Sequence, residues 1–319
     1  MEFFTSLFNL DKTKLYRNDI ERCIGDFIKD YCEEANIEIE IRLGRFRWKK
    51  HAMPEQIEEE WLTKYPDRDG PSPLFNIGNQ SEVVLNRVMP QQLSSLQYEF
   101  DASITKEHAD YISKFLYETS RTYRDDGSHI SVKTSLVADE TRTDQFGEAI
   151  RISRKMEKNS AGEMIKENEP FAFLRKRRLE NLDILVPGAD YDVRISASIE
   201  DEVFDRSFSA TEINVFCREK SRMSFARPMG QYDWTKIVNY RVDFIEEQER
   251  ETLYECEFEL SRMAVEELKA KKDTAEFYSC VEAVTNNMRE LAYLTTKCYK
   301  PLRSRKASST SSAEKIRKQ

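Results

Sequence analysis

Apolar side chains recur at helical spacing in three separate stretches of the chain. From residue 18 to residue 34 they form one stripe of an amphipathic helix. A second helix is expected to begin at Thr105, whose hydroxyl can cap it. From Phe277 to Leu291 the apolar positions step by four and three, which predicts a long third helix. Because such stripes usually face a core, we expect these helices to pack against the rest of the fold.

Between about residues 127 and 260 the apolar positions recur every second residue, which is the period of a strand. The same period occurs at 37–46 and at 97–101, and turn signals separate most of these segments. The strands expected after residue 127 cover 128–137, 147–156, 170–186, 191–200, 213–224, 236–245 and 253–260. About eight or nine strands whose neighbours pair favour a mainly β, antiparallel fold with flanking helices, either a closed barrel or a sandwich.

The segment from about residue 47 to residue 95 interrupts these periods. It is rich in polar residues and prolines, and only 55–62 carries a short helical pattern, so we interpret it as an irregular insertion. Residues 301–319 are basic and rich in serine, which is typical of a disordered tail. The remainder, residues 1–300, is expected to form a single domain.

Composition narrows the class of protein. The chain has 319 residues, of which 34% are charged and 39% hydrophobic, and its net charge is −8. This is too rich in core-forming side chains for a disordered protein, and no apolar run is long enough to span a membrane, so we expect a soluble globular protein without a secretory signal. Six scattered cysteines and three histidines indicate reduced thiols, with neither a disulfide framework nor a zinc site.

Two strands carry acidic residues on one face. In 37–44, Glu38 and Glu40 share a face with Arg42, and in 254–260 the same alternation groups Glu255, Glu257 and Glu259. In any single antiparallel strand a solvated polar face is the more common explanation. Like charges repeated along one face nevertheless repel one another unless a positive charge lies nearby, and a divalent cation held by carboxylate oxygens would supply it.

Other strands supply the opposite charge. Arg218, Lys220 and Arg222 share one face, and Arg241 shares a face with Asp243. Further charged residues alternate with apolar ones at Arg151, Arg194 and Glu200. The charged face of any one of these strands is about as easily explained by a stripe on the protein surface as by a binding site. Together the strands favour a hydrophilic lumen that binds a metal on one wall and phosphates on another.

Four segments in this order resemble a known family: IEIEIRLG at 37–44, the pattern RxKxR at 218–222, YRVDF at 240–244 and ECEFE at 255–259. They are similar to the fungal, protist and viral type of metal-dependent mRNA-capping RNA 5′-triphosphatase, in the triphosphate tunnel metalloenzyme superfamily. YDVRISASIE at 191–200 is similar to the strand of this family that ends in a tunnel-lining glutamate. The resemblance extends from about residue 20 to residue 260 and implies an eight-stranded antiparallel β-barrel tunnel with a charged lumen.

The resemblance also implies roles for individual residues. Mg²⁺ or Mn²⁺ would be held by Glu38, Glu40 and Glu259. Glu255 and Glu257 would bind the surrounding water or a second metal, and one of them would orient the nucleophilic water. The triphosphate would be bound by Arg218, Lys220, Arg222 and Arg241, with Asp243 fixing the basic side chains. Further phosphate-binding candidates are Arg151, Lys176 and Arg194, and further tunnel residues are Arg42 and Glu200. Which residues of the basic run 175–178 face the tunnel stays open.

The implied reaction is hydrolysis of the γ-phosphate of 5′-triphosphate RNA ends, the first step of cap formation, in the nucleus or, for a viral protein, in the cytoplasm. Two alternatives stay open: a related tunnel enzyme acting on inorganic tripolyphosphate, thiamine triphosphate or nucleotides, and a non-enzymatic RNA-binding barrel. The basic run and basic tail favour RNA as partner. This sequence departs from the family pattern at Arg42, a position at which the superfamily often has lysine. No counterpart is evident of the Trp-rich peptide with which some fungal members recruit the mRNA guanylyltransferase, so binding of that partner is an open question. Whether the protein forms a homodimer also stays open.

Overall fold

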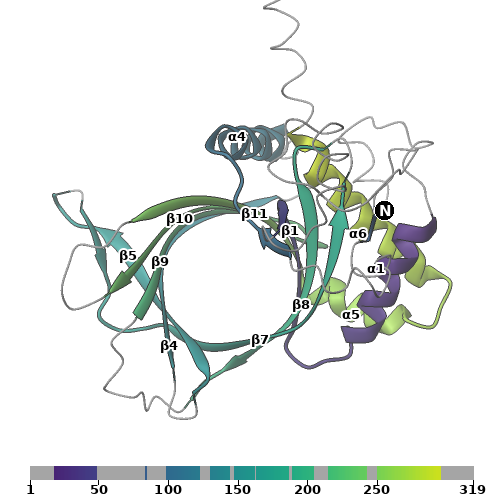
Figure 1. Ribbon diagram of the computed structural model, residues 1–319, viewed down its shortest axis with the longest axis horizontal. Helices are drawn as coiled ribbons and strands as arrows, with labels where there is room; N and C mark the ends of the chain where they lie inside the picture. The colour runs from purple at the N-terminus through teal and green to yellow at the C-terminus, as the bar shows by residue number, and fades with distance from the viewer. Residues whose placement is uncertain are drawn as a thin grey trace, which may run out of the picture.

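Eight strands of the computed structural model close into an antiparallel barrel (Figure 1). The structure describes residues 18–48, 83–84, 98–122, 130–143, 147–161, 163–186, 189–204, 215–242 and 250–295. The barrel strands are β1 (Ile37–Trp48), β4 (Ser131–Thr143), β5 (Ala149–Lys158), β7 (Ala172–Leu185), β8 (Asp192–Glu202), β9 (Val215–Ala226), β10 (Gly230–Val242) and β11 (Glu251–Leu260). They follow one another round the barrel as β1, β11, β10, β9, β4, β5, β7 and β8, and pairing of β5 with β7 completes the closure. The expected eight-stranded antiparallel barrel is confirmed.

In the part of the chain that the structure describes, three short strands extend this barrel without joining it. β2 (Val83–Val84) pairs with the end of β7, β3 (Tyr98–Asp101) pairs with the end of β1, and β6 (Met164–Lys166) pairs with the end of β5. The strand predicted at 97–101 therefore exists but lengthens the sheet beside β1.

Within the described residues, four helices flank the barrel: α1 (Asn18–Tyr31), α4 (Lys106–Thr122), α5 (Arg262–Lys271) and α6 (Glu276–Leu294). Figure 1 shows α1, α5 and α6 together on one side of the barrel and α4 above β10 and β11. As expected, Thr105 caps α4: its hydroxyl oxygen accepts a hydrogen bond from the backbone N–H of His108. Helix α5 was not predicted from the apolar pattern. None of the described helices has the length and apolar character needed to cross a lipid bilayer.

The core lies between the helices and the outer face of the barrel. Ile41 of β1, Val193 of β8 and Phe258 of β11 are fully buried and belong to one apolar cluster with Val281 and Met288 of α6. Since successive side chains of a strand point to opposite faces, packing this apolar face against the helices directs the polar face of the same strands into the barrel.

The largest extensions beyond the bounds predicted from the apolar pattern are those of β4 and β10. β4 continues to Thr143 instead of ending at 137, and β10 begins at Gly230 instead of 236. At Gly230 a side chain would clash with the backbone oxygen of Glu259 and with the ring of Phe258, so the glycine permits the close pairing of β10 with β11.

The predicted insertion at about 47–95 is described only in part. β1 continues through Trp48, and Val83–Val84 pair with β7. The short helical pattern at 55–62 and the tail at 301–319 lie outside the described residues. The cysteines within the described ranges all carry free thiols, as expected.

Candidate active site in the barrel lumen

The two acidic strands lie side by side with their charged faces in the lumen. Glu40 of β1 is directly opposite Glu259 of β11, and Arg42 is opposite Glu257. Glu40 is only 4% exposed and Glu257 only 8% exposed. The acidic faces recognised in the sequence are therefore enclosed by the barrel and do not form a solvated outer surface.

Lys176 of β7, which is separated from β1 by β8, reaches the acidic wall. Its ammonium group binds the carboxylate of Glu38 and lies 3.5 Å from Glu40 and 3.4 Å from Glu200. Arg178, two residues along, also lies 3.5 Å from Glu40. Within the basic run, Lys176 and Arg178 thus reach the lumen carboxylates, which the sequence alone left undecided.

Arg175 and Arg177, the other two members of the basic run 175–178, do not contact the lumen carboxylates in this way. The guanidinium Nε of Arg175 lies 2.8 Å from Glu148, and Arg177 is exposed.

Glu257 is an ionised carboxylate held by two guanidinium groups. Arg42 Nε lies 3.0 Å from one carboxylate oxygen, and Arg222 lies 3.9 Å from the other. Burial alone would raise the pKa of Glu257, but the positive charges of Arg42, Arg222 and Lys220 hold it below its ordinary value. Glu257 is therefore available as a hydrogen-bond acceptor at neutral pH.

Glu259 lies in a region of negative potential. Burial, followed by the charges of Glu38, Asp233 and Glu40, raises the pKa of Glu259 to about 8. No ion pair to Glu259 is found among the described side chains. The position favours a cation, because a positive charge there would relieve the repulsion among these carboxylates.

The three cations of β9 each bind a carboxylate from a different strand. Arg218 lies 2.8 Å from Glu255 of β11, Lys220 2.6 Å from Asp139 of β4, and Arg222 2.9 Å from Asp233 of β10. Arg218, and Arg222 through its 3.9 Å approach to Glu257, bring the basic wall predicted from the sequence into contact with the acidic strand β11, as the hypothesis of one charged lumen requires.

Sequence reasoning missed Asp139 and Asp233. Asp139 is 5% exposed, accepts a hydrogen bond from Ser153 at 2.7 Å and faces Arg218 across the sheet, while Asp233 is 1% exposed. Both were missed because they lie in the parts of β4 and β10 that the apolar pattern did not include. The signal that could have found them is register. Extending β4 by alternation places Asp139 opposite Arg218, and extending β10 places Asp233 opposite Ser224, diagonal to Arg222.

The remaining predicted residues occupy the edges of this network. Arg151 lies 3.1 Å from Glu200, which places both beside Lys176. Arg194 makes two hydrogen bonds to Asp183, at 2.6 and 3.0 Å, and its guanidinium lies over the ring of Phe100 at 4.6 Å.

The structure does not bring Arg241 into the central network. It lies near the end of β10, is exposed, and is opposite Phe216 in the ladder with β9. Asp243, its predicted partner, lies outside the described residues.

The donor set fits a hard divalent cation. Glu38, Glu40 and Glu259 offer only carboxylate oxygens, which suit Mg²⁺ or Mn²⁺ better than zinc. In the part of the chain that the structure describes, no three His, Cys, Asp or Glu side chains are already gathered as a metal cluster. The reason is visible in the ion pairs: Lys176 holds Glu38, and Arg42 holds Glu40.

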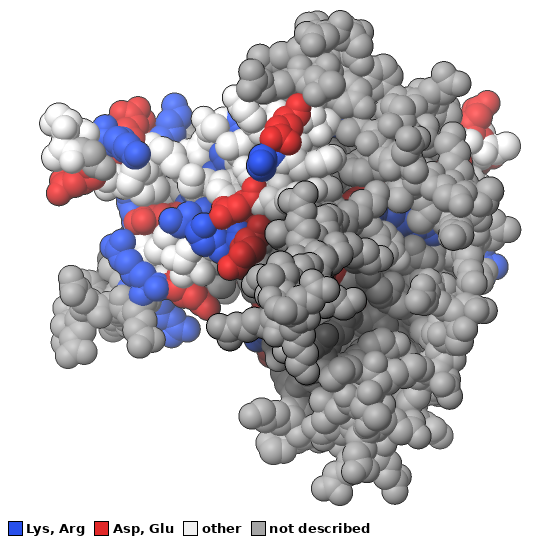
Figure 2. Space-filling model, turned by 90° about the horizontal axis from the view of Figure 1, so that it is seen from above, with Lys and Arg blue, Asp and Glu red and all other residues white. Residues whose placement is uncertain are grey.

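Charged side chains outside the lumen follow a different pattern. Figure 2 shows Lys, Arg, Asp and Glu interleaved on the face of the molecule seen there. Independently of that view, the ion pairs show one group of mixed charge around Glu140, with Arg154 at 2.8 Å and Arg142 at 3.5 Å. Alternation places Glu140 on the face of β4 opposite to Asp139, so this group is separate from the lumen network.

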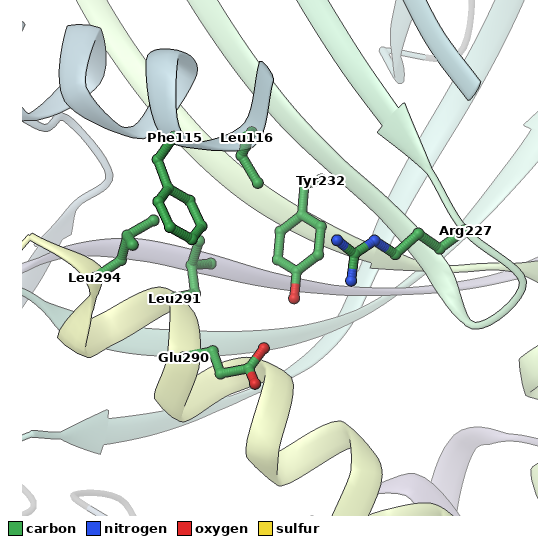
Figure 3. Close-up of a pocket in the computed structure, with 7 residues that line it drawn as sticks. All are labelled: Phe115, Leu116, Arg227, Tyr232, Glu290, Leu291 and Leu294. Atoms are coloured by element: carbon green, nitrogen blue, oxygen red, sulfur yellow. The ribbon is translucent and has the colours of Figure 1, made fainter. Parts of the chain in front are cut away.

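A pocket between α4 and α6 is also separate from the lumen network. Figure 3 shows Phe115 and Leu116 of α4 above Leu291 and Leu294 of α6, with Tyr232, Arg227 and Glu290 at one side. The phenol of Tyr232 donates to Asn287 at 2.5 Å and its ring belongs to the apolar core. The pocket is a gap in the packing between the helices and the barrel, and none of the predicted site residues lines it.

Comparisons with known proteins agree with this geometry. Two solved structures of the S. pombe RNA triphosphatase Pct1 match the fold, with TM-scores of 0.63 and 0.62, sequence identities of 23% and 21%, coverage of 88% of this chain in both cases, and coverage of 95% and 94% of theirs. The first of them contains Pct1 in complex with the Spt5 CTD. The mRNA-capping enzyme subunit beta of Candida albicans is 25% identical over 205 residues, which cover 60% of this chain and 37% of that relative.

The family match covers most of the barrel. Residues 73–297 match the family described as mRNA capping enzyme, beta chain. Glu38 and Glu40 precede the matched residues, and it is the pairing of β1 with both β8 and β11 that includes them in the same barrel. With its tunnel fold and a match over most of its length, the chain belongs to the mRNA capping enzyme beta chain family.

Proposed function

We propose that this protein hydrolyses the γ-phosphate of 5′-triphosphate RNA ends and leaves 5′-diphosphate ends, as the first step of cap formation. Family membership supports this reaction class. The observation that carries the proposal is that Glu257 forms ion pairs with Arg42 and Arg222 inside a closed barrel. Enclosed opposite charges of this kind can bind a polyanion and activate water in one place.

The lumen is nearly neutral without its substrate. Its cations are Arg42, Arg151, Lys176, Arg178, Arg194, Arg218, Lys220 and Arg222, and its anions are Glu38, Glu40, Asp139, Asp183, Glu200, Asp233, Glu255, Glu257 and Glu259. Each cation is held by a carboxylate, so the basic side chains are already oriented before a triphosphate arrives. Such preorganisation reduces the cost of rearranging charge during the reaction.

The positions of the side chains support the following roles. Arg218, Lys220 and Arg222 point into the lumen at alternate positions of β9 and would bind the phosphate oxygens. Glu257, which is ionised, would accept a hydrogen bond from the attacking water and orient it in line with the leaving diphosphate. Arg42 stabilises the ionised form of Glu257.

We propose that Glu38, Glu40 and Glu259 hold Mg²⁺ or Mn²⁺ in the working enzyme. A bound divalent cation supplies Lewis-acid polarisation of a phosphate oxygen and neutralises developing charge. Phosphate oxygens would attract Lys176 away from Glu38, because an ammonium group shared among three carboxylates can also bind a polyanion. Isothermal titration with Mn²⁺ tests this assignment: the Glu38→Gln and Glu40→Gln variants should bind Mn²⁺ much more weakly than the parent protein.

Hydrolysis assays separate this function from its alternatives. The protein is incubated with Mg²⁺ or Mn²⁺ and γ-labelled triphosphate RNA, ATP or tripolyphosphate, beside Glu257→Gln and the matched surface variant Glu266→Gln. Phosphate release from RNA that is lost only in Glu257→Gln supports the proposal. Cleavage of tripolyphosphate or ATP without cleavage of RNA would favour a related tunnel phosphatase, and RNA binding without any hydrolysis would favour a binding barrel.

The relatives support a proposal for the cellular setting. We propose that the protein acts in the nucleus beside a guanylyltransferase, because one relative is named as a capping enzyme subunit and another was solved in complex with the Spt5 CTD. We also propose that residues 1–300 form one catalytic domain and 301–319 a tail. Co-purification from nuclear extract tests the partner, and sedimentation of the purified protein decides between a monomer and a homodimer.

A further inference from the structure

A row of four lumen-facing residues crosses neighbouring strands where β9 begins and β10 ends. Arg241 of β10 is opposite Phe216 of β9, Phe216 is opposite Thr141 of β4, and Thr141 is opposite Arg151 of β5. Alternation places Phe216 on the same face as Arg218, which binds the lumen residue Glu255. The row therefore forms part of the rim of the charged lumen.

Phe216 is more accessible than the aromatic residues of the barrel strands that belong to the apolar core. It is 38% exposed and does not belong to the apolar core, whereas Phe225 and Phe258 of the same sheet are buried there. The exposed guanidinium of Arg241 lies beside it in the ladder. An accessible aromatic ring next to an arginine is the combination on which single-stranded nucleic acids stack their bases.

Asn239 provides a polar group one step deeper. It lies on the same face of β10 as Arg241 and is opposite Arg218. Its side-chain oxygen is buried and has no hydrogen-bond partner within the described ranges. A buried amide oxygen without a partner is costly in the free protein and is satisfied when a ligand donates a hydrogen bond to it.

We propose that Phe216, Arg241 and Asn239 form a binding subsite for the first nucleoside of the RNA. This inference rests on the proposed function and deepens it. The base stacks on Phe216, Arg241 lies against the base or the next phosphate, and the ribose 2′-hydroxyl donates to Asn239. Phe216 is two residues, or about 7 Å, along β9 from Arg218. This spacing is short enough for one nucleotide to connect the phosphate-binding wall with the rim.

The subsite gives Arg241 a role other than binding the triphosphate. Inorganic tripolyphosphate has no base or ribose and cannot use these three side chains. They should therefore contribute to selection of RNA over tripolyphosphate, a distinction that the central ion-pair network does not provide.

The test compares two substrates in the full-length protein. In Phe216→Ala the KM for a short 5′-triphosphate RNA should rise about tenfold, because base stacking on an aromatic side chain is worth roughly 1–3 kcal/mol. The kinetics with tripolyphosphate should not change. Phe216→Trp should restore RNA affinity, and Tyr117→Ala, which removes an exposed aromatic from α4, serves as the matched control. The proposal is overturned if Phe216→Ala affects neither substrate or affects both equally.

A binding measurement keeps this test independent of the proposed function. The Kd of a labelled 5′-triphosphate trinucleotide is measured by fluorescence anisotropy in the Glu257→Gln background, with and without Phe216→Ala. If wild-type protein failed to cleave RNA, the proposed function would fall, but weaker RNA binding by Phe216→Ala would still support the subsite. Equal RNA binding by the two proteins would refute it.

The role of Asn239 has its own readout. Wild-type protein should bind the trinucleotide more tightly than its counterpart with a 2′-deoxy first nucleotide, since a hydroxyl donor to Asn239 is missing there. Asn239→Ala should remove this difference. Persistence of the difference in Asn239→Ala would assign ribose recognition to another group.

Discussion

Glu40 of β1 lies directly opposite Glu259 of β11, so that two carboxylates face one another inside the barrel. Cross-strand neighbours of like charge repel, and burial increases this repulsion. Glu40 is bound by Arg42, and the pKa of Glu259 is raised to about 8. The pair therefore links the stability of the protein to pH and to bound cations.

The metal-free protein should lose stability as the pH rises from about 4.5 to about 8. The folded state holds the proton on Glu259 more tightly than the unfolded state, whose carboxyl has a pKa near 4.5, so unfolding is favoured as that proton is lost. Glu259→Gln should flatten this decline, and Glu266→Gln on the surface of α5 should not. Urea unfolding at several pH values in the presence of a chelator measures the effect. The same slope in Glu259→Gln would show that another group is responsible.

Mn²⁺ should bind more tightly at higher pH and release a proton as it binds. Glu259 must give up its proton to become a ligand, so affinity should increase as the pH approaches 8. Titration calorimetry in two buffers of different ionisation enthalpy measures the protons released. Proton release that is unchanged in Glu259→Gln would be evidence against this role.

Removing Arg222 should destabilise the protein by about 3 kcal/mol, because it leaves Asp233 as an uncompensated buried carboxylate. The double variant Arg222→Ala/Asp233→Ala should recover much of this loss without recovering hydrolysis. Chemical denaturation and phosphate-release assays on the three variants separate the two effects. If the double variant were no more stable than Arg222→Ala, the 2.9 Å pair would not be the source of the destabilisation.

Gly230→Ala should lower both thermal stability and affinity for Mn²⁺. The added methyl group would press against the backbone of Glu259 and the ring of Phe258, and would separate the paired ends of β10 and β11. Because Glu259 is moved with its backbone, the metal site should weaken as well. Thermal unfolding and Mn²⁺ titration check the two effects, and an unchanged melting temperature would contradict the close approach.

The alternation in IEIEIRLG and ECEFE was sufficient to predict two strands and to group their charged residues on common faces. It could not show that these faces are opposite each other, because the register of β1 against β11 joins residues more than 200 positions apart. Family resemblance supplied the tunnel, and the structure confirms it. The ends of β4 and β10, with Asp139 and Asp233, were missed because their polar residues weaken the apolar pattern.

Local alternation along the chain was enough to establish the period of each strand and which side chains share a face, because both depend only on neighbouring residues. The tertiary structure decided which face is enclosed. The helices cover the apolar face of β1, β8 and β11, and closure through β5 and β7 surrounds the charged face. The tertiary structure also places Arg241 at the rim of the barrel and Arg222 in its centre. The depth of a residue in a barrel depends on the register of all the strands.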